Sequence, residues 1–397
     1  MFHSSMNRLP RGCRTVGGAK ARAMERCRRT FMSRFASFGY DPFLPSGLQL
    51  IQSAWERLPE DLKDRTVCLT SPFGEPCCLR ADLTLAAVAY LGAHHAPQER
   101  PLRLCYAERV YRTSPPPESD LESTQIGAEL LGWDGEGADG EVLFLLLDFL
   151  QSLAIDATVV LGDTNLLKRA FQGVSADRAQ SLTAALQQGN LADYAALVRG
   201  LPSPAADLAE LPFLRGGPEV LRRGAELFGN EALATLRGLA DTLKDLGMGD
   251  RIRFDLSLVR ELDYYSGPLF DVYGGPSGRA LGGGGRYDSL LADFGILGQA
   301  LGFGLDLERV ALAADEGEDR PERALAWAAN LPPSEALAKA LAYAERGLDL
   351  ELSWLTSGEE SLHLARLKGF SLWVDLRLGV FLDTGTGERT VPTGGER

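Results

Sequence analysis

The sequence contains few of the groups that enzymes use for covalent or metal chemistry. It has only four histidines in 397 residues, and none stands in a Ser/His/Asp-like pattern. The adjacent pair His94-His95 has no further ligand at the spacing of a zinc site. We therefore predict no catalytic residue, no bound metal and no cofactor.

Long apolar segments and paired cysteines are also missing. No apolar run reaches the ~20 residues that span a bilayer. The nearest, residues 142–155, contains Asp148 and indicates a buried helix, so we expect no membrane association. Six cysteines lie within the first 105 residues without a C-x-x-C spacing, and Cys77-Cys78 is a vicinal pair. This pattern favours reduced, buried thiols in a cytoplasmic protein over disulfides or a metal site.

Basic residues are outnumbered by acidic ones. The net charge is −13 and the isoelectric point is near 5.0, which disfavours a nucleic-acid partner because Lys and Arg supply the affinity for phosphates. The exception is residues 1–24, with five basic residues and no acids. This start is similar to a transit peptide. We favour an irregular start that runs into the basic face of a first helix.

The remaining pattern predicts alternating helices and strands. A first helix over residues 19–39 has Phe31, Phe35 and Phe38 as a buried stripe and ends at Gly39. The later predictions are two short strands with a Gly turn (67–80), a helix from near Asp82, and a hairpin with a long loop (102–133). They continue with a helical region (about 165–249), strands over 251–259 and from 268, a glycine-rich turn (274–289) and an apolar helix (300–314).

We predict two domains from this pattern. The acidic stretch 314–322 is typical of a linker, so residues 1–318 form one domain, with a helical insertion at about 165–249. Residues 319–397 alternate strand and helix patterns and form a small α/β domain.

The segment "RELDYYSGPLFDVY", residues 260–273, contains several charged and phenolic side chains close together in the sequence. Arg260, Asp263, Tyr264 and Tyr265 precede a glycine at the entry to a strand. Paired tyrosines are typical of aromatic packing at a sheet edge. Two phenols beside an arginine equally suit the polar floor of a small-ligand pocket. Both interpretations remain open from the residues alone.

Several ordered segments resemble the histidyl-tRNA synthetase family and its catalytic-core relatives. "RFASFGYDPF" is similar to the first class II motif and "CLRADLTLAAVAY" to an L-R-P-[DE]-x-T segment. "VYR…STQIGAELLG" is similar to the second motif, "RELDYYSGPLFDVY" to a histidine-specific element, and "GGGGRYDSLL…LGFGLDLERV" to the third motif region. The resemblance implies an α+β (mixed) fold with an antiparallel sheet flanked by helices. It also implies that the tail is a reduced anticodon-binding domain.

The resemblance also implies a histidine-binding site. In the family, the residues matching Asp82, Thr84 and Gln125 hold the α-ammonium group, and Arg112 lies near the carboxylate and phosphate. Glu129, Tyr264 and Tyr265 match the residues that read the imidazole. Arg260 completes the candidate set, and it and Arg309 match residues that the family uses around ATP. The chemistry is consistent, because a zwitterion needs both charges and an imidazole needs a donor and an acceptor.

The loop between the hairpin strands departs from the synthetase pattern. The positions of a phosphate-gripping Glu and Arg are Ser114 and Pro115, and "ESDLES" replaces G-R-x-R. Each charged hydrogen bond is worth ~1.5–3 kcal/mol, so losing two slows adenylation by ~10²–10⁴. Glu118, Asp120 and Glu122 would add repulsion. The tail has more acids than bases, which argues against tRNA as a partner.

This combination is similar to the regulatory subunits of ATP phosphoribosyltransferase, which act in the first step of histidine biosynthesis. The resemblance implies a noncatalytic chain that assembles with short-form catalytic subunits, four of each in a hetero-octamer, and enables activity and histidine feedback. Self-association through the class II core and free histidine as a ligand are further expectations. The alternatives are a divergent histidyl-tRNA synthetase or amino-acid ligase, or a histidine-binding module with an unrelated partner.

Overall fold

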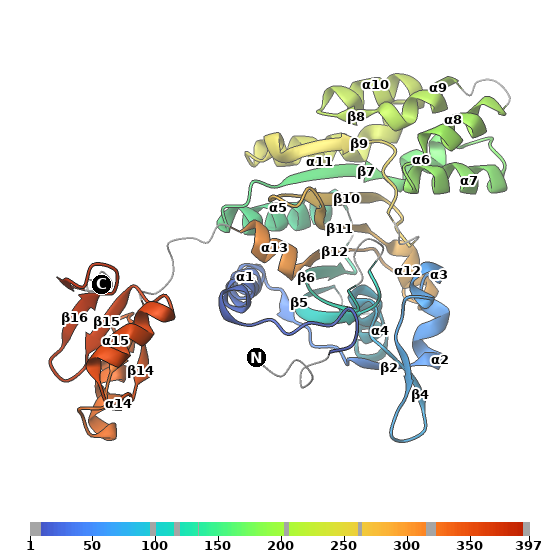
Figure 1. Ribbon diagram of the computed structural model, residues 1–397. Coiled ribbons are helices and arrows are strands. Elements are labelled where there is room, and N and C mark those ends of the chain that lie inside the picture. The colour runs from blue at the N-terminus through green and yellow to red at the C-terminus, as the bar shows by residue number, and fades with distance from the viewer. Residues whose placement is uncertain are drawn as a thin grey trace. The chain divides into compact units, whose positions relative to one another are not determined.

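The computed structural model describes residues 9–95, 101–114, 120–133, 135–201, 206–260, 264–314 and 323–391. The chain divides into two compact units, residues 1–315 and 316–397. Figure 1 shows the sheet of the first unit between layers of helix, and the second unit with its own sheet.

A nine-stranded mixed sheet organises the first unit. Its order is β1-β5-β6-β12-β11-β10-β7-β9-β8, with parallel pairing only at β1–β5 and β7–β9. This confirms the predicted α+β fold with a mainly antiparallel sheet. The strands are β1 Asp41–Pro42, β5 Leu102–Tyr111, β6 Glu122–Leu131, β7 Thr158–Asp163, β8 Arg215–Gly216, β9 Ile252–Asp255, β10 Pro268–Tyr273, β11 Ala280–Arg286 and β12 Ala300–Asp306.

The helices of this unit cover the sheet and form an insertion. Those near the two sheet faces are α1 Gly18–Ala36, α4 Leu83–His94, α5 Glu136–Ser152, α12 Asp288–Asp293 and α13 Leu307–Ala313. The others are α2 Ile51–Ala54, α3 Glu60–Lys63, α6 Thr164–Ala170, α7 Ala176–Gln187, α8 Leu191–Arg199, α9 Ala206–Glu210, α10 Glu219–Phe228 and α11 Ala234–Asp245. A small sheet, in the order β2-β4-β3, consists of β2 Leu48–Leu50, β3 Cys68–Thr70 and β4 Pro76–Leu79.

Alternation along β6 separates two cores. Ile126, Ala128 and Leu130 pack in one cluster with Phe31 of α1 and the apolar side chains of α5. The side chains between them face the other side of the sheet, because successive strand residues point to opposite faces. There the apolar face of α4 covers the sheet. The buried helix predicted over 142–155 corresponds to α5, which ends at Ser152, and most of its apolar side chains are buried.

Three local predictions are wrong. Phe38 is 48% exposed because α1 ends at Ala36 and the chain turns at Gly39, whose φ is +78°. The first half of residues 300–314 is strand β12, followed by the short helix α13. The predicted strand over 251–259 ends at Asp255, where Oδ1 accepts a hydrogen bond from the Ser257 amide and turns the chain.

The predicted glycine-rich turn over 274–289 is right only in its first part, because residues 274–279 connect β10 to β11 but the rest is mostly strand β11 and the start of α12. Gly282 to Gly285 lie within β11, hydrogen-bonded between β10 and β12 in the middle of the sheet. A Cβ atom on Gly284 would overlap the carbonyl oxygen of Gly302. These glycines therefore permit close approach of neighbouring strands, one of the roles of glycine inside a strand.

The second unit has a five-stranded sheet in the order β14-β13-β15-β16-β17. Its elements are β13 Arg323–Trp327, α14 Pro333–Ala344, β14 Asp349–Ser353, α15 Gly358–Leu367, β15 Leu372–Asp375, β16 Val380–Asp383 and β17 Arg389–Thr390. The alternation of strand and helix agrees with the sequence pattern. No helix in the described segments of either unit has both the length and the apolar character needed to cross a lipid bilayer.

Candidate functional site

Glu129 is the centre of a polar cluster between the sheet and α4. Its side chain is fully buried, and its Oε1 accepts hydrogen bonds from Oγ1 of Thr84 (2.8 Å) and Oη of Tyr106 (3.1 Å). Its Oε2 accepts a further bond from the hydroxyl of Tyr287. Burial raises the pKa of Glu129 to about 8, although the three hydroxyls and above all that of Tyr287 oppose the shift.

Asp82 begins α4 beside this cluster. Its Oδ1 caps the helix by accepting a hydrogen bond from the Leu85 amide at 2.8 Å, which satisfies one of the free amides of the first turn. Its Oδ2 lies 3.8 Å from Nη1 of Arg112, which also donates to the carbonyl of Ala81 at 2.7 Å. Burial raises the pKa of Asp82, and the Arg112 guanidinium opposes the shift.

The tyrosines predicted from the sequence pack against this cluster. The ring centroids of Tyr264 and Tyr287 lie 6.0 Å apart, and those of Tyr264 and Tyr265 lie 5.1 Å apart. The Arg260 guanidinium lies 5.8 Å from the Tyr265 centroid, and its Nη1 pairs with Asp271 and donates to the Phe270 carbonyl. A series of contacts therefore runs from Glu129 through aromatic rings to Arg260.

Seven of the eight predicted residues are linked by contacts into two groups, one around Asp82 and Arg112 and one around Glu129. Asp82 caps α4 and Thr84 lies two residues later in its first turn, so the start of this helix connects the two groups. Gln125 shares a face of β6 with Glu129, because the two residues are four apart. Its side-chain oxygen lies near Gly304 of β12. Asp263 lies outside the described residues.

Glycines provide the space for the polar side chains. Gly302 is directly opposite Glu129 in the β6–β12 register, and a Cβ atom there would overlap Oε2 of Glu129. A Cβ atom on Gly283 would likewise overlap Nη1 of Arg260, and one on Gly127 would overlap the ring of Tyr106. The glycine-rich strands therefore leave this face of the sheet open for carboxylate, phenol and guanidinium groups.

Two residues that hold Glu129 were not predicted. Tyr106 lies directly opposite Gly127 in the β5–β6 register, and Tyr287 follows β11 at the entry to α12. No local sequence signal marked Tyr106, because its position opposite Gly127 depends on the register of the hairpin. Tyr287 lies within the quoted third-motif segment, where it was not assigned a role.

The cluster is found in a chain with clear relatives. A profile of the histidyl-tRNA synthetase family matches residues 12–310. The ATP phosphoribosyltransferase regulatory subunit of Bacillus pumilus is 36% identical over 287 residues, which cover 69% of this chain and 72% of the relative. The regulatory subunit of Variovorax paradoxus is 35% identical over 313 residues, covering 76% and 81%. This chain belongs to the family of ATP phosphoribosyltransferase regulatory subunits.

Solved structures place this regulatory-subunit family within the histidyl-tRNA synthetase fold. A Bacillus halodurans protein described as an ATP phosphoribosyltransferase regulatory subunit/histidyl-tRNA synthetase superposes with a TM-score of 0.80 at 25% identity, covering 93% of this chain and 97% of that one. A histidyl-tRNA synthetase from Nostoc has a TM-score of 0.78 at 15% identity, covering 96% of each chain, and supports the fold alone.

The described ends of the loop that distinguishes this member from synthetases are held by protein contacts. The amide of Ser114 donates to the carbonyl of Asp120, and Asp120 pairs with Arg14 at 2.6 Å. Arg14 also lies 2.8 Å from Glu308 of α13. The predicted repulsion from Asp120 is therefore partly neutralised. Residues 115–119, with Pro115 and Glu118, lie outside the described residues.

Glu122 and the two arginines that match ATP-site residues of synthetases also have partners. Glu122 pairs with Arg109 at 3.1 Å. Nη1 of Arg309 donates to the Ala280 carbonyl at 2.8 Å, and its Nε lies 3.9 Å from Asp306. Arg260 is held by Asp271. Both arginines thus make contacts with central strands, Arg260 with β10 and Arg309 with the start of β11.

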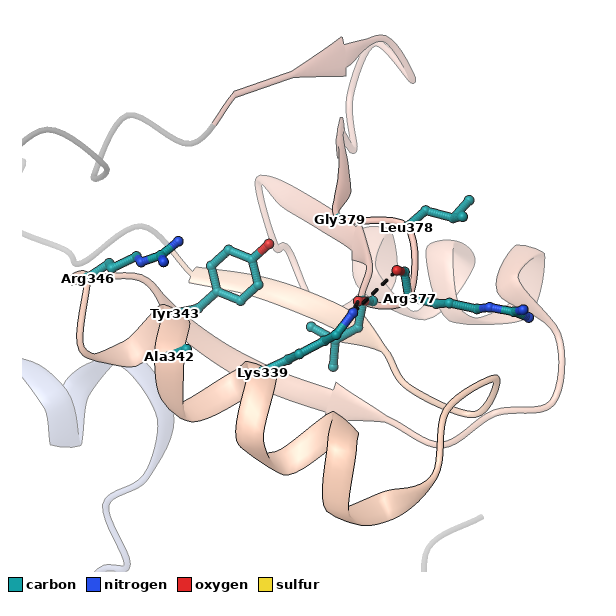
Figure 2. A pocket seen from close by; sticks show the side chains of 8 residues that line it. Lys339, Ala342, Tyr343, Arg346, Arg377, Leu378 and Gly379 are labelled. Carbon is teal, nitrogen blue, oxygen red and sulfur yellow. Dashed lines mark hydrogen bonds between the residues drawn. The ribbon is translucent and has the colours of Figure 1, made fainter.

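A surface pocket of about 260 Å³ lies in the second unit. Figure 2 shows Lys339 of α14 pointing toward the β15–β16 turn, where Nζ donates to the carbonyls of Leu376 (3.2 Å) and Arg377 (3.4 Å). The guanidinium groups of Arg346 and Arg377 lie at opposite sides of the view, with Lys339 between them. The cations do not converge on one point, so we assign no ligand to this pocket.

Proposed function

We propose that this chain is a noncatalytic regulatory subunit of ATP phosphoribosyltransferase in the first step of histidine biosynthesis. The supporting observation is 36% identity to a regulatory subunit over 287 residues. The loss of the phosphate-gripping cations from residues 114–122 agrees with a chain that does not form an adenylate, because that reaction needs positive charge at the phosphates. The proposed site of action is the cytoplasm.

The proposed partner is a short-form catalytic subunit, with four copies of each chain in the assembly. Mixing the two purified proteins tests the pairing. We expect a larger complex by light scattering, and a rise in the rate at which the catalytic subunit joins ATP to phosphoribosyl pyrophosphate. Two unshifted species with an unchanged rate would refute the pairing.

We further propose that the polar cluster binds free histidine. Asp82 supplies an anion for the ammonium group, Arg112 supplies a cation for the carboxylate, and Glu129 supplies a partner for an imidazole nitrogen. The alternative is a hydrogen-bonded core network without a ligand. The three hydroxyl bonds to Glu129 are compatible with that alternative, because a buried carboxyl needs such partners.

Calorimetry on the whole chain separates the two interpretations. Glu129→Ala removes the imidazole partner while Asp82 remains, so histidine affinity should fall at least tenfold if the cluster is a ligand site. Asp163→Asn is the matched control, because Asp163 is also a buried acid but caps α6. Equal histidine affinity in folded wild type and Glu129→Ala would establish the core-network interpretation.

Self-association through residues 35–44 is the last part of the proposal. Phe38 is 48% exposed and Leu44 is 79% exposed, while Phe35, Tyr40 and Phe43 are buried. Two large apolar side chains in one exposed segment suit a contact with a second copy, because neighbouring exposed apolar groups mark interaction surfaces.

A further inference from the structure

Two thiols face each other across the β3–β4 hairpin of the small sheet. Cys68 of β3 is paired directly with Cys78 of β4. The adjacent pair is hydrogen-bonded, because the Leu79 amide donates to the Val67 carbonyl at 2.8 Å. Hydrogen-bonded and non-hydrogen-bonded pairs alternate along an antiparallel ladder. Cys68 and Cys78 therefore form a non-hydrogen-bonded pair, in which the Cα atoms stand about 4.5 Å apart.

This arrangement is within reach of a disulfide. Bridged cysteines have Cα atoms about 4.4–6.8 Å apart, and directly opposed strand residues project from the same face of the sheet. Both thiols are free. Cys68 is exposed, contrary to the prediction of buried thiols, whereas Cys78 is 1% exposed, so one thiol is open to a soluble oxidant and the other is shielded from it.

The neighbouring Cys77 does not share this geometry. It pairs with Leu69 of β3 and Leu50 of β2, and the alternation of side chains puts it on the opposite face from Cys78. The vicinal sequence Cys77-Cys78 thus contains one thiol that faces Cys68 and one that faces away. Cys77 is therefore a matched control within the same strand.

We propose that Cys68 and Cys78 form a redox modification site that closes as a cross-strand disulfide in the presence of a peroxide. The Cys68 thiolate attacks one peroxide oxygen, the O–O bond breaks, and water leaves once a proton is taken up, which gives a sulfenic acid. The Cys78 sulfur then attacks the Cys68 sulfur, the S–O bond breaks, and a second water leaves. Two thiols and one hydrogen peroxide become one disulfide and two waters.

The different burial of the two cysteines determines which thiol reacts first. Burial, together with the adjacent thiols, raises the pKa of Cys78, which disfavours its thiolate as the first nucleophile. The exposed Cys68 is then oxidised first, and Cys78 resolves the sulfenic acid. An exposed cross-strand bridge is open to thiol exchange, so a small thiol reverses the modification. The site is independent of the proposed regulatory function.

Peptide mapping of the whole oxidised chain tests the proposal. The protein is treated with one equivalent of hydrogen peroxide, alkylated and digested with chymotrypsin without reduction. Cleavage after Phe73 separates Cys68 from Cys77 and Cys78. We expect two fewer free thiols and a cross-linked peptide pair that dithiothreitol separates. Cys77→Ser should give the same bridge at an unchanged yield, whereas Cys68→Ser and Cys78→Ser should give none.

The same variants also show which results would contradict the proposed disulfide. Because Cys68 is exposed, Cys68→Ser should keep the wild-type unfolding midpoint and remains informative if Cys78→Ser fails to fold. A bridge that disappears in Cys77→Ser would overturn the assignment of Cys78. A bridge only between two chains, or stable sulfinic acid on Cys68 with Cys78 still reduced, would overturn the proposal itself.

Discussion

Glu129 and Gly302 are opposed across the β6–β12 pair so closely that a Cβ atom on residue 302 would overlap Oε2 of Glu129. The position of the carboxylate therefore depends on a residue without a side chain on another strand. The same relationship connects Arg260 with Gly283. The polar cluster can keep its geometry only if these glycines are present as well as the polar residues.

Gly302→Ala should displace the Glu129 side chain. We expect a loss of about 1–3 kcal/mol in the free energy of unfolding, typical of overpacking, and weaker histidine binding. Gly137→Ala in α5 is the control, because a Cβ atom there meets nothing within 4 Å. Denaturant unfolding and calorimetry measure both quantities. Equal stability of the two variants would show that the site tolerates the added methyl group.

The raised pKa of Glu129 predicts a dependence of stability on pH. Between about 4.5 and 8, the unfolded chain has lost this proton while the folded chain retains it. This contribution to stability therefore falls as pH rises through that window, by an upper limit of the order of 5 kcal/mol. Relative to wild type, Glu129→Gln removes the titration, so its unfolding midpoint should decline less. Parallel pH profiles for the two proteins would contradict the assignment.

The sequence was sufficient to predict the elements with local signals. Asp82 precedes an apolar helical pattern and caps α4, and the two strands of the β5–β6 hairpin are marked by their composition. The prediction of a turn at the glycines of β11 was wrong because their position depends on non-local contacts. Glycines usually mark turns, but those of β11 are required by the neighbouring strands and by Arg260 above them. No local pattern contains that information.

The candidate site shows the same division. Its residues were chosen through family motifs, and Asp82 and Arg112 indeed lie together. Tyr106 was missed because its role follows from the register that puts it opposite Gly127, next to Glu129. Register is set across strands, and a single residue can be assigned to a site only when that register is known.

We expect the purified chain to have no histidine-activating activity. Histidine-dependent exchange of pyrophosphate into ATP should stay at background, because loss of two charged contacts slows adenylation by ~10²–10⁴. A histidyl-tRNA synthetase assayed in parallel is the positive control. Exchange at a comparable rate, or charging of tRNA, would favour the synthetase alternative.

Self-association should depend on the exposed apolar side chains near the end of α1. Leu44→Glu places a charge in the proposed contact and should shift the chain from dimer to monomer in light scattering. Leu297→Glu is the control, since Leu297 is 92% exposed and lies in the loop before β12. A dimer that persists in Leu44→Glu and Phe38→Asp would place the contact elsewhere.

The most direct test of the central claim is a histidine inhibition curve on the reconstituted ATP phosphoribosyltransferase. With a short-form catalytic subunit, the wild-type chain should raise turnover and confer inhibition by histidine. Glu129→Ala should raise turnover equally but shift half-inhibition to at least tenfold higher histidine, which corresponds to about 1.4 kcal/mol of lost coupling. If the wild-type chain neither raises turnover nor confers inhibition, the regulatory function is wrong. If Glu129→Ala matches wild type in both, the polar cluster is not the histidine sensor.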